Sequence, residues 1–226
     1  MKISTVIVAA GSGKRMGAGI NKVYMPLGDE CVLWHTIKAF ADSKAVDELV
    51  IVTGGEDMIK AAETAALFDL PFTVVEGGAE RQNSVLNGIT AAEGDIVVVH
   101  DGARAMITPL LIGEVIKAAK EFGGAALGVA PKDTIKTADN DGFISGTVER
   151  KSAYLIQTPQ VFKREELIKA HEKAIEDGFA ATDDCAVMER MGAKIKIIEG
   201  SYENIKLTTP EDIFTAERIL KEREQK

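Results

Sequence analysis

The segment VIVAAGSGKRMG, residues 6–17, is an apolar strand that runs directly into a glycine-rich turn. Glycines let the backbone adopt positive φ and approach a ligand closely, which leaves N–H groups free to point at phosphate oxygens. The turn also carries two cations, Lys14 and Arg15, and Lys22 follows it. These local features favour a phosphate-binding turn, with a plain tight turn after the first strand as the alternative.

The spacing of the glycines separates this turn from two widespread phosphate-binding motifs. A Walker A loop needs four residues between its first glycine and a Gly-Lys-Ser/Thr sequence, which residues 11–17 lack. The dinucleotide-binding sequence Gly-x-Gly-x-x-Gly is not matched either, because Gly17 comes one residue too late. The cations suit a triphosphate, whereas backbone groups commonly hold a dinucleotide pyrophosphate.

Short runs of β-branched residues alternate with helical patterns through most of the remaining sequence. The run Val97–Val99 is continuously apolar, as expected for a strand that is covered on both faces. Such alternation predicts right-handed crossovers and a mostly parallel sheet between layers of helices. The predicted strands are Ser4–Ala9, Glu48–Val52, Thr73–Glu76, Ile96–His100, Ala125–Val129 and Lys194–Glu199. The predicted helices are Leu33–Asp42, Glu56–Ala65, Arg81–Ala92, Pro109–Phe122, Arg164–Asp177, Asp183–Met191 and Pro210–Glu222.

Residues 133–148 break this alternation and predict a β-hairpin. Two β-prone runs, Thr134–Thr137 and Phe143–Val148, flank an Asp-Asn-Asp-Gly sequence, and an Asp-Gly pair in that position is a strong hairpin signal. A hairpin inserted late in a doubly wound sheet must project from it or pair elsewhere. We therefore expect an α/β fold with a doubly wound, mostly parallel sheet. It forms one domain over residues 1–226, with a projecting β-hairpin arm at about residues 132–154.

Composition excludes some classes of function. The chain has 226 residues, of which 46% are apolar and 27% charged, as in ordinary globular proteins. Its net charge of −8 argues against broad nucleic-acid binding, which usually needs a basic face. The apolar stretch Val6–Ala10 is too short to span a bilayer, and Cys31 and Cys185 lack the spacing of a metal site. These features predict a cytoplasmic protein without nucleic-acid or membrane partners.

Several motifs together resemble a known family. The turn at residues 9–17 and the sequence NKVY at 21–24 are similar to the signature of nucleotidyltransferases that activate sugar or polyol phosphates. Six further segments narrow the resemblance to the 2-C-methyl-D-erythritol 4-phosphate cytidylyltransferases of the non-mevalonate isoprenoid pathway. They are GGAERQNSV (77–85), HDGAR (100–104), DTIK (133–136), QTPQ (157–160), TDD (182–184) and EGSYENIK (199–206). The chain departs from the family at Asn21 and Ala105, where proline is frequent.

The resemblance implies a Rossmann-like nucleotidyltransferase fold and transfer of CMP from CTP to 2-C-methyl-D-erythritol 4-phosphate, with release of pyrophosphate. Because this reaction joins two anions, fixed cations and alignment should supply catalysis rather than a nucleophilic side chain. The catalytic residues that the resemblance implies are Arg15, Lys22 and Lys206. Taken alone, Arg15 and Lys22 would fit exposed surface cations equally well, and a solvated surface would be the better explanation for Lys206.

The resemblance also implies a site for CTP and Mg²⁺. Asp101 follows a buried strand, and a carboxylate there suits Mg²⁺ bound together with substrate phosphates, with a helix or turn cap as the alternative. Ser84 contacts the ribose or base by resemblance, although it would also fit a half-buried helix serine. Arg81, in the first turn of a predicted helix, opposes the helix dipole and indicates an anionic or acidic partner. The nucleotide-binding residues implied are Ala9, Ala10, Gly11, Ser12, Gly13, Gly77, Gly78, Ser84, Asp101 and Ala103.

The polyol-phosphate site is implied in the same way. The guanidinium of Arg150 matches a phosphate, threonine and aspartate suit polyol hydroxyls, and Arg104 either pairs with Asp101 or contacts substrate. Thr182 also fits a helix N-cap. In the family the hairpin arm reaches across a twofold axis to the neighbouring subunit, so a homodimer with shared active sites follows as a prediction. The substrate-binding residues implied are Arg104, Thr134, Arg150, Thr158, Thr182 and Asp183.

Three other interpretations remain open at the level of sequence. A ribitol-5-phosphate cytidylyltransferase shares the scaffold but usually has Ser-Val in place of Gly102-Ala103. A non-catalytic Rossmann-type nucleotide-binding protein shares the fold, but the glycine spacing and the three separated cations argue against it. An inactive family member that serves as a dimeric partner is the third. The histidines lack metal-ligand spacing; we expect His35 and His171 on helix surfaces and assign His100 no chemical role.

Overall fold

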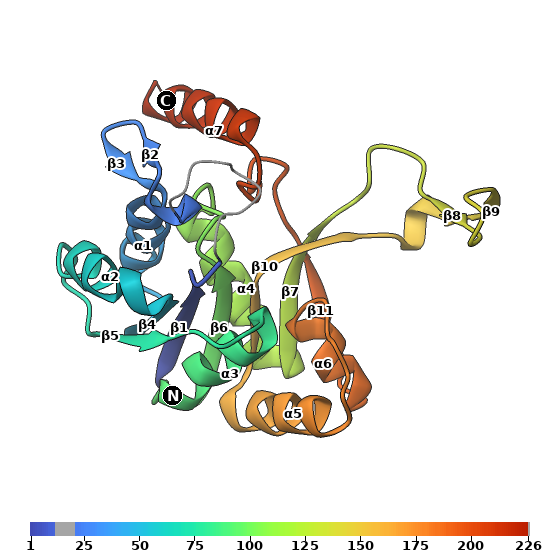
Figure 1. The fold of residues 1–226 in the computed structure, drawn as a ribbon, viewed down its shortest axis with the longest axis horizontal. Helices are drawn as coiled ribbons and strands as arrows, with labels where there is room; N and C mark the ends of the chain where they lie inside the picture. The colour runs from blue at the N-terminus through green and yellow to red at the C-terminus, as the bar shows by residue number, and fades with distance from the viewer. Residues whose placement is uncertain (12–20, 226) are drawn as a thin grey trace.

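The computed structural model describes residues 1–11 and 21–225 and has a seven-stranded central sheet (Figure 1). Strand β10 runs antiparallel to both of its neighbours, and the other neighbouring strands are parallel. The strands, in order across the sheet, are β11 (Lys196–Glu199), β7 (Gly124–Val129), β10 (Leu155–Lys163), β6 (Ile96–Asp101), β1 (Ile3–Val8), β4 (Glu48–Thr53) and β5 (Phe72–Glu76). The predicted doubly wound, mostly parallel sheet is therefore confirmed.

Helices cover both faces of the sheet. One apolar core contains buried residues of α1, α2, α4 and α7, and a second core on the opposite face contains those of α3, α5 and α6. The helices are α1 (Val32–Ser43), α2 (Met58–Ala65), α3 (Arg81–Ala91), α4 (Pro109–Phe122), α5 (Arg164–Glu176), α6 (Asp184–Arg190) and α7 (Pro210–Glu224). The part of the chain that the structure describes also contains the 3₁₀ turns η2 (Lys22–Tyr24), η3 (Gly55–Asp57) and η4 (Arg150–Ser152). Of the helices described, none has the length and apolar character needed to cross a membrane.

Local sequence signals explain why most elements lie where the sequence predicts them. Val97, Val98 and Val99 have 0% exposure, in keeping with a strand covered on both faces. Helix α7 begins at Pro210, as predicted, and Thr209 and Asp212 form a capping box around this residue. The chain leaves β1 for β4 and β5 on one side and returns to β6 on the other. The sheet therefore reverses its order between β1 and β6, which makes this its topological switch point.

Strand β10 is the one strand of the seven-stranded central sheet that sequence patterns miss. Its sequence contains Pro159 and polar residues on both sides of it, a composition that usually argues against a central strand. The strand tolerates the proline because the register with β7 shifts between Ile156 and Gln160, so the ladder is interrupted there. Gln157, Thr158 and Gln160 are buried but hydrogen-bonded to other parts of the chain.

The predicted hairpin arm is also present. Strands β8 (Lys136–Ala138) and β9 (Ile144–Thr147) form a separate two-stranded sheet that projects far from the central sheet (Figure 1). The turn is fixed by Asp139, whose Oδ1 accepts hydrogen bonds from the backbone N–H groups of Asp141 and Phe143 at 3.0 and 2.9 Å. A second small hairpin, β2 (Pro26–Leu27) with β3 (Glu30–Cys31), precedes α1.

Candidate active site

A polar pocket of about 420 Å³ lies at the carboxyl ends of β1 and β6, the switch point of the sheet. Ligands of open α/β sheets bind at such a point, because the crossovers to either side leave a crevice there. The pocket brings together residues from the strand ends, the 3₁₀ turn η2, the start of α3 and a loop near the C-terminus. Its lining is Val8, Ala9, Ala10, Gly11, Asn21, Lys22, Val23, Gly78, Ala79, Glu80, Arg81, Ser84, Asp101, Ala103 and Lys206.

Two glycines let the backbone close the pocket wall beside Ala10. A Cβ at Gly77 would lie 2.4 Å from the Cβ of Ala10, and one at Gly78 would lie 2.3 Å from the Cβ of Asn83. The Gly78 N–H donates to Ser84 Oγ at 3.1 Å, and that hydroxyl donates to the Glu80 carbonyl at 3.1 Å. Ser84 therefore ties the turn to helix α3 while it lines the pocket, and its predicted contact with the nucleotide stays a prediction.

The segment that follows β1 lines the pocket as far as the structure describes it. Ala9, Ala10 and Gly11 line it as expected, whereas Ser12, Gly13 and Arg15 lie outside the described residues. Lys22 lines the pocket from η2, which Asn21 caps. The Asn21 amide donates to the Ala9 carbonyl at 2.7 Å and to Asp57 at 3.1 Å. The residue that replaces the family's frequent proline thus holds η2 against the end of β1.

Asp101 is the electrostatic centre of the pocket. Its carboxylate lies 2.7 Å from Lys206 Nζ, 3.3 Å from Arg81 Nε and 3.8 Å from Arg104 Nε. Burial by itself raises the pKa of this carboxyl, but the charges of Arg81 and Lys206 outweigh burial and hold the pKa well below its usual range. Asp101 is therefore an ionised carboxylate at neutral pH, and it gathers three cations that come from different elements.

Arg104 is held largely by the protein itself. Its side chain is 13% exposed and its guanidinium donates to the Asn204 carbonyl at 2.8 Å, and burial lowers the pKa of the Arg104 side chain. Asn204, itself fully buried, donates to the Thr158 carbonyl at 2.9 Å. Arg104 thereby links the end of β6 to the loop that carries Lys206. The predicted pairing of Arg104 with Asp101 is present at 3.8 Å.

Thr158 and His100 support Asp101 from behind. The Thr158 hydroxyl accepts from the Asp101 N–H at 3.0 Å and lies 3.0 Å from His100 Nδ1. His100 is fully buried, and burial lowers its pKa to about 3, so its ring is neutral at physiological pH. Thr158 is 3% exposed and is absent from the pocket lining. Its position fits orientation of Asp101, and its predicted contact with substrate stays a prediction.

Among the residues that the structure describes, Asp101 is the one carboxylate in the lining of the pocket that lies among cations suited to phosphates. Across residues 1–11 and 21–225, no group of three or more His, Cys, Asp or Glu side chains could hold a metal ion. Mg²⁺ characteristically takes one or two carboxylates and completes its shell with water and substrate phosphates. Asp101 supplies one ionised carboxylate in a pocket that also holds cations for phosphates, so the residues fit Mg²⁺ that arrives with a nucleotide.

The remaining predicted substrate residues do not line this pocket. Thr134 and Arg150 lie at the base of the arm, both exposed, with Arg150 donating to Thr134 Oγ1 at 3.4 Å. Asp183 caps α6 by accepting from the Ala186 N–H at 2.9 Å, and it also accepts from Gln160 at 3.0 Å. The alternative that Thr182 caps this helix is therefore wrong, because the N-cap is Asp183.

Residues that the sequence did not assign complete the surroundings of Asp101. Asp184 has 0% exposure, and its carboxylate lies 2.9 Å from the Arg81 guanidinium. The other oxygen of this carboxylate is hydrogen-bonded to His171 Nε2 at 3.1 Å. The expectation that His171 lies on a helix surface is wrong, since its exposure is 1%. Its Asp184 partner explains the burial. The unfavourable position of Arg81 at the start of α3 was the one sequence signal for this cluster, and its acidic partners are Asp101 and Asp184.

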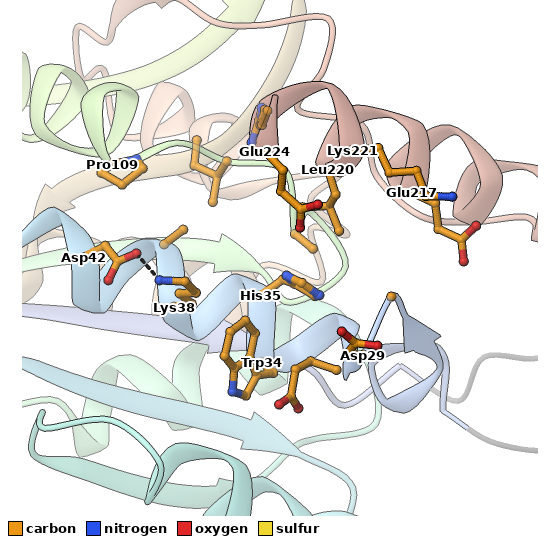
Figure 2. A pocket seen from close by; sticks show the side chains of 16 residues that line it. Asp29, Trp34, His35, Lys38, Asp42, Pro109, Glu217, Leu220, Lys221 and Glu224 are labelled. Atoms are coloured by element: carbon orange, nitrogen blue, oxygen red, sulfur yellow. Dashed lines mark hydrogen bonds and ion pairs between the residues drawn. The ribbon is translucent and has the colours of Figure 1, made fainter. Parts of the chain in front are cut away.

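A larger cavity of about 840 Å³ lies elsewhere, between α1 and α7 (Figure 2). Trp34, His35 and Lys38 of α1 form one wall, and Leu220 and Glu224 of α7 form the other. We call this cavity the α1–α7 groove. It contains none of the catalytic, nucleotide-binding or substrate-binding residues that the sequence predicts.

The sheet topology and the cation-lined pocket at its switch point define an α/β protein whose pocket suits an anionic ligand such as a nucleotide. A family model described as 2-C-methyl-D-erythritol 4-phosphate cytidylyltransferase matches residues 3–222. A protein of that name from Caldanaerobacter subterraneus is 48% identical over 98% of this chain and 100% of its own length. One from Desulforamulus reducens is 43% identical over 98% of this chain and 97% of its own.

Solved structures agree with these relatives. A 4-diphosphocytidyl-2C-methyl-D-erythritol synthase from Anaerococcus prevotii has a TM-score of 0.89 at 31% identity, covering 97% of this chain and 96% of that one. A 2-C-methyl-D-erythritol 4-phosphate cytidylyltransferase from Thermus thermophilus has a TM-score of 0.81 at 30% identity, covering 98% and 100%. The chain therefore belongs to the 2-C-methyl-D-erythritol 4-phosphate cytidylyltransferase family of enzymes.

Proposed function

We propose that this enzyme transfers CMP from CTP to 2-C-methyl-D-erythritol 4-phosphate and releases pyrophosphate, a step of isoprenoid precursor synthesis. The single observation that carries the proposal is the convergence of Arg81, Arg104 and Lys206 on Asp101 at the switch point of the sheet. Family membership gives the substrates, and this charge arrangement gives a pocket that suits a polyphosphate.

The chemistry needs charge and alignment more than proton transfer. A phosphate oxygen of the polyol phosphate attacks the α-phosphorus of CTP, a new P–O bond forms, and the bond to the bridging oxygen of the leaving pyrophosphate breaks. The attacking phosphate is already ionised at neutral pH, so no general base is required. Negative charge accumulates around the phosphorus, and Arg15, Lys22 and Lys206 are the cations proposed to stabilise it.

The nucleotide is proposed to lie across the turn that follows β1. The backbone of residues 9–13 and of Gly77 and Gly78 would surround the triphosphate and base, with Ser84 and Ala103 beside them. Mg²⁺, when bound with CTP, would neutralise phosphate charge. Asp101 is the residue proposed to hold it, because its carboxylate is ionised and faces the pocket.

The polyol phosphate is proposed to bind between the hairpin arm of one copy and the body of a second copy. Thr134 and Arg150 belong to the arm, whereas Arg104, Thr158, Thr182 and Asp183 belong to the body of the same chain. We propose that residues 1–226 form one domain and that its arm, at about residues 132–154, completes the site of a second copy in a homodimer. The exposed Phe143 and Ile144, at 72% and 69%, support a partner for the arm. The cytoplasmic location remains a prediction from the sequence.

A paired-substrate assay tests the proposed activity. The purified protein is incubated with CTP, Mg²⁺ and either 2-C-methyl-D-erythritol 4-phosphate or ribitol 5-phosphate, and pyrophosphate release is measured. We expect turnover with the methylerythritol substrate alone. Turnover restricted to ribitol 5-phosphate would replace the proposed substrate. A melting temperature that rises with NAD but not with CTP would instead support a non-catalytic binding protein.

A complementation assay tests the shared site. Arg150→Ala and Lys206→Ala homodimers should each be inactive, and the two proteins are then unfolded, mixed in equal amounts and refolded. If the arm serves the neighbouring copy, each mixed dimer regains one intact site, and about a quarter of wild-type activity returns for random pairing. If each arm serves its own body, both sites of the mixed dimer are defective and no activity returns.

A further inference from the structure

Two adjacent aspartates begin helix α6, and they differ in what they contact. Asp183 is partly exposed and caps the helix. Asp184 points inward, is 0% exposed, and its backbone N–H donates to Gln160 Oε1 at 3.0 Å. An ionised carboxylate at such depth is strongly disfavoured unless cations and hydrogen bonds compensate for the lost water. The side chains that contact Asp184 must therefore stabilise its buried charge.

Asp184 has a partner on each oxygen. Its Oδ1 lies 3.1 Å from His171 Nε2 of α5, and its Oδ2 lies 2.9 Å from the Arg81 guanidinium of α3. Burial raises the pKa of the Asp184 carboxyl, but the charge of Arg81 and the hydrogen bond from His171 outweigh it and lower the pKa. Asp184 is thus a buried anion, and among residues 1–11 and 21–225 its charged side-chain contact toward the pocket is Arg81.

Arg81 connects Asp184 to the pocket because it contacts both Asp184 and Asp101. The same guanidinium that meets Asp184 also donates from Nε to Asp101 Oδ1 at 3.3 Å, while Lys206 holds the other oxygen of Asp101 at 2.7 Å. A cation in the first turn of α3 opposes the helix dipole, so Arg81 needs its two carboxylates to stay in this position. Arg81 is also part of the pocket lining.

We propose that Asp184 is a positioning residue for the transfer reaction: it holds Arg81 between two carboxylates and thereby fixes the orientation of Asp101. This inference rests on the proposed function. In the cluster, two carboxylates face three cations. Removal of the charge on Asp184 leaves Arg81 bound by Asp101 alone, so the arginine becomes free to follow the phosphates and Asp101 loses its fixed orientation.

A purely structural role for Asp184 makes a different prediction. Asp184 also joins α3, α5 and α6, and loss of such a link would destabilise the fold whether or not Asp101 is present. A role that acts through Asp101 disappears once Asp101 has lost its carboxylate, because the effects of coupled residues are not additive. The decisive measurement is therefore kcat in a double-mutant cycle.

The cycle compares wild type, Asp184→Asn, Asp101→Asn and the double variant, with melting temperatures measured for each. We expect Asp184→Asn to lower kcat by roughly 10- to 100-fold, as loss of a residue that orients a ligand-binding group does. In the Asp101→Asn background the same change should lower kcat by less than about twofold. An equal loss in both backgrounds would overturn the proposal, as would an unimpaired Asp184→Asn enzyme.

Two further variants keep the test decisive. Asp177→Asn removes an exposed carboxylate that pairs with Lys173 and Arg190, and it should leave kcat unchanged. If Asp184→Asn does not fold, His171→Gln removes the other partner of Asp184 without touching Arg81 or Asp101, and it enters the same cycle with Asp101→Asn. A wild-type protein that is inactive with CTP and 2-C-methyl-D-erythritol 4-phosphate would overturn the proposed function before any variant is compared.

Discussion

The α1–α7 groove and the pocket at the switch point differ in size and in charge, and the smaller of these two cavities is the candidate active site. The α1–α7 groove has about 840 Å³ and the pocket at the switch point about 420 Å³. In the groove, Lys38 pairs with Asp42 one helical turn away, and Arg223 pairs with Glu203. In the pocket, three cations from separate elements converge on one buried carboxylate. Convergence of charge therefore indicates the reaction site better than volume does.

One loop separates the two cavities. It follows β6, and Ala103 lines the pocket while Ala105 and Ile107 line the groove. The Ala103 carbonyl accepts from the Leu207 N–H at 2.9 Å, which fixes the loop next to Lys206. The groove and the pocket thus lie on opposite sides of the loop that follows β6. The comparison can be tested with matched substitutions on the two sides of this loop.

The largest difference is expected for one lysine on each side of this loop. Lys206→Met should lower kcat by roughly 10²- to 10³-fold, because it removes a cation proposed to stabilise the transition state. Lys221→Met, which changes the same residue type in the groove, should leave kcat within about twofold of wild type. Steady-state kinetics with CTP and the polyol phosphate would measure both. Equal losses in the two variants would end the distinction between the cavities.

A smaller loss is expected behind Asp101. Thr158→Val keeps the shape of the side chain but removes the hydroxyl that accepts from the Asp101 N–H. We expect kcat/KM to fall about 10-fold, since the carboxylate loses one constraint on its position. Thr215→Val, at an exposed position of α7, removes a comparable hydroxyl that donates to the Glu211 carbonyl and serves as the control. A loss of the same size in the control would argue against a role for Thr158 at the site.

In the groove, an apolar change should affect stability rather than activity. Leu220→Ala removes a partly buried side chain of α7 and should cost about 1–2 kcal/mol of unfolding free energy, or a few degrees in Tm. The value of kcat should stay unchanged. Denaturant unfolding and kinetics on one preparation would show whether the groove influences the pocket, and a tenfold loss of kcat would demonstrate that it does.

The last expected effect is a dependence of stability on pH. Because burial lowers the pKa of His100 to about 3, the unfolded chain binds a proton between about pH 6.5 and pH 3 that the folded protein does not. His100 therefore contributes stability that is complete above about pH 6.5 and is lost as the pH falls, by up to about 1.4 kcal/mol per pH unit. Unfolding free energies measured between pH 7 and pH 5 should fall less steeply in His100→Gln, and parallel slopes would contradict this account.

Sequence reasoning located the sheet and the edges of its strands because each signal there is local. The apolar run Val97–Val99 by itself indicates a buried strand. Because Asp101 follows this run, the sequence also indicates that Asp101 lies at the carboxyl end of that strand. Arg104, three residues along the chain, is a local partner of Asp101, but the other cations around Asp101 come from distant segments. Arg81 and Asp184 are 103 positions apart, and nothing near either residue indicates the other. Strand β10 was missed for a related reason, since its polar side chains are buried only through partners that arrive from distant segments.

The reversed direction of β10 has a consequence for how this fold can vary. Because β10 is antiparallel to β7, the end of β7 lies beside the start of β10, and no crossover helix is needed to join them. Residues 130–154 are therefore an insertion whose two ends are already anchored side by side. Doubling the length of such a segment costs only about 0.6 kcal/mol in closure entropy. The arm can lengthen or shorten through insertions and deletions without disturbing the register of the strands that hold Asp101.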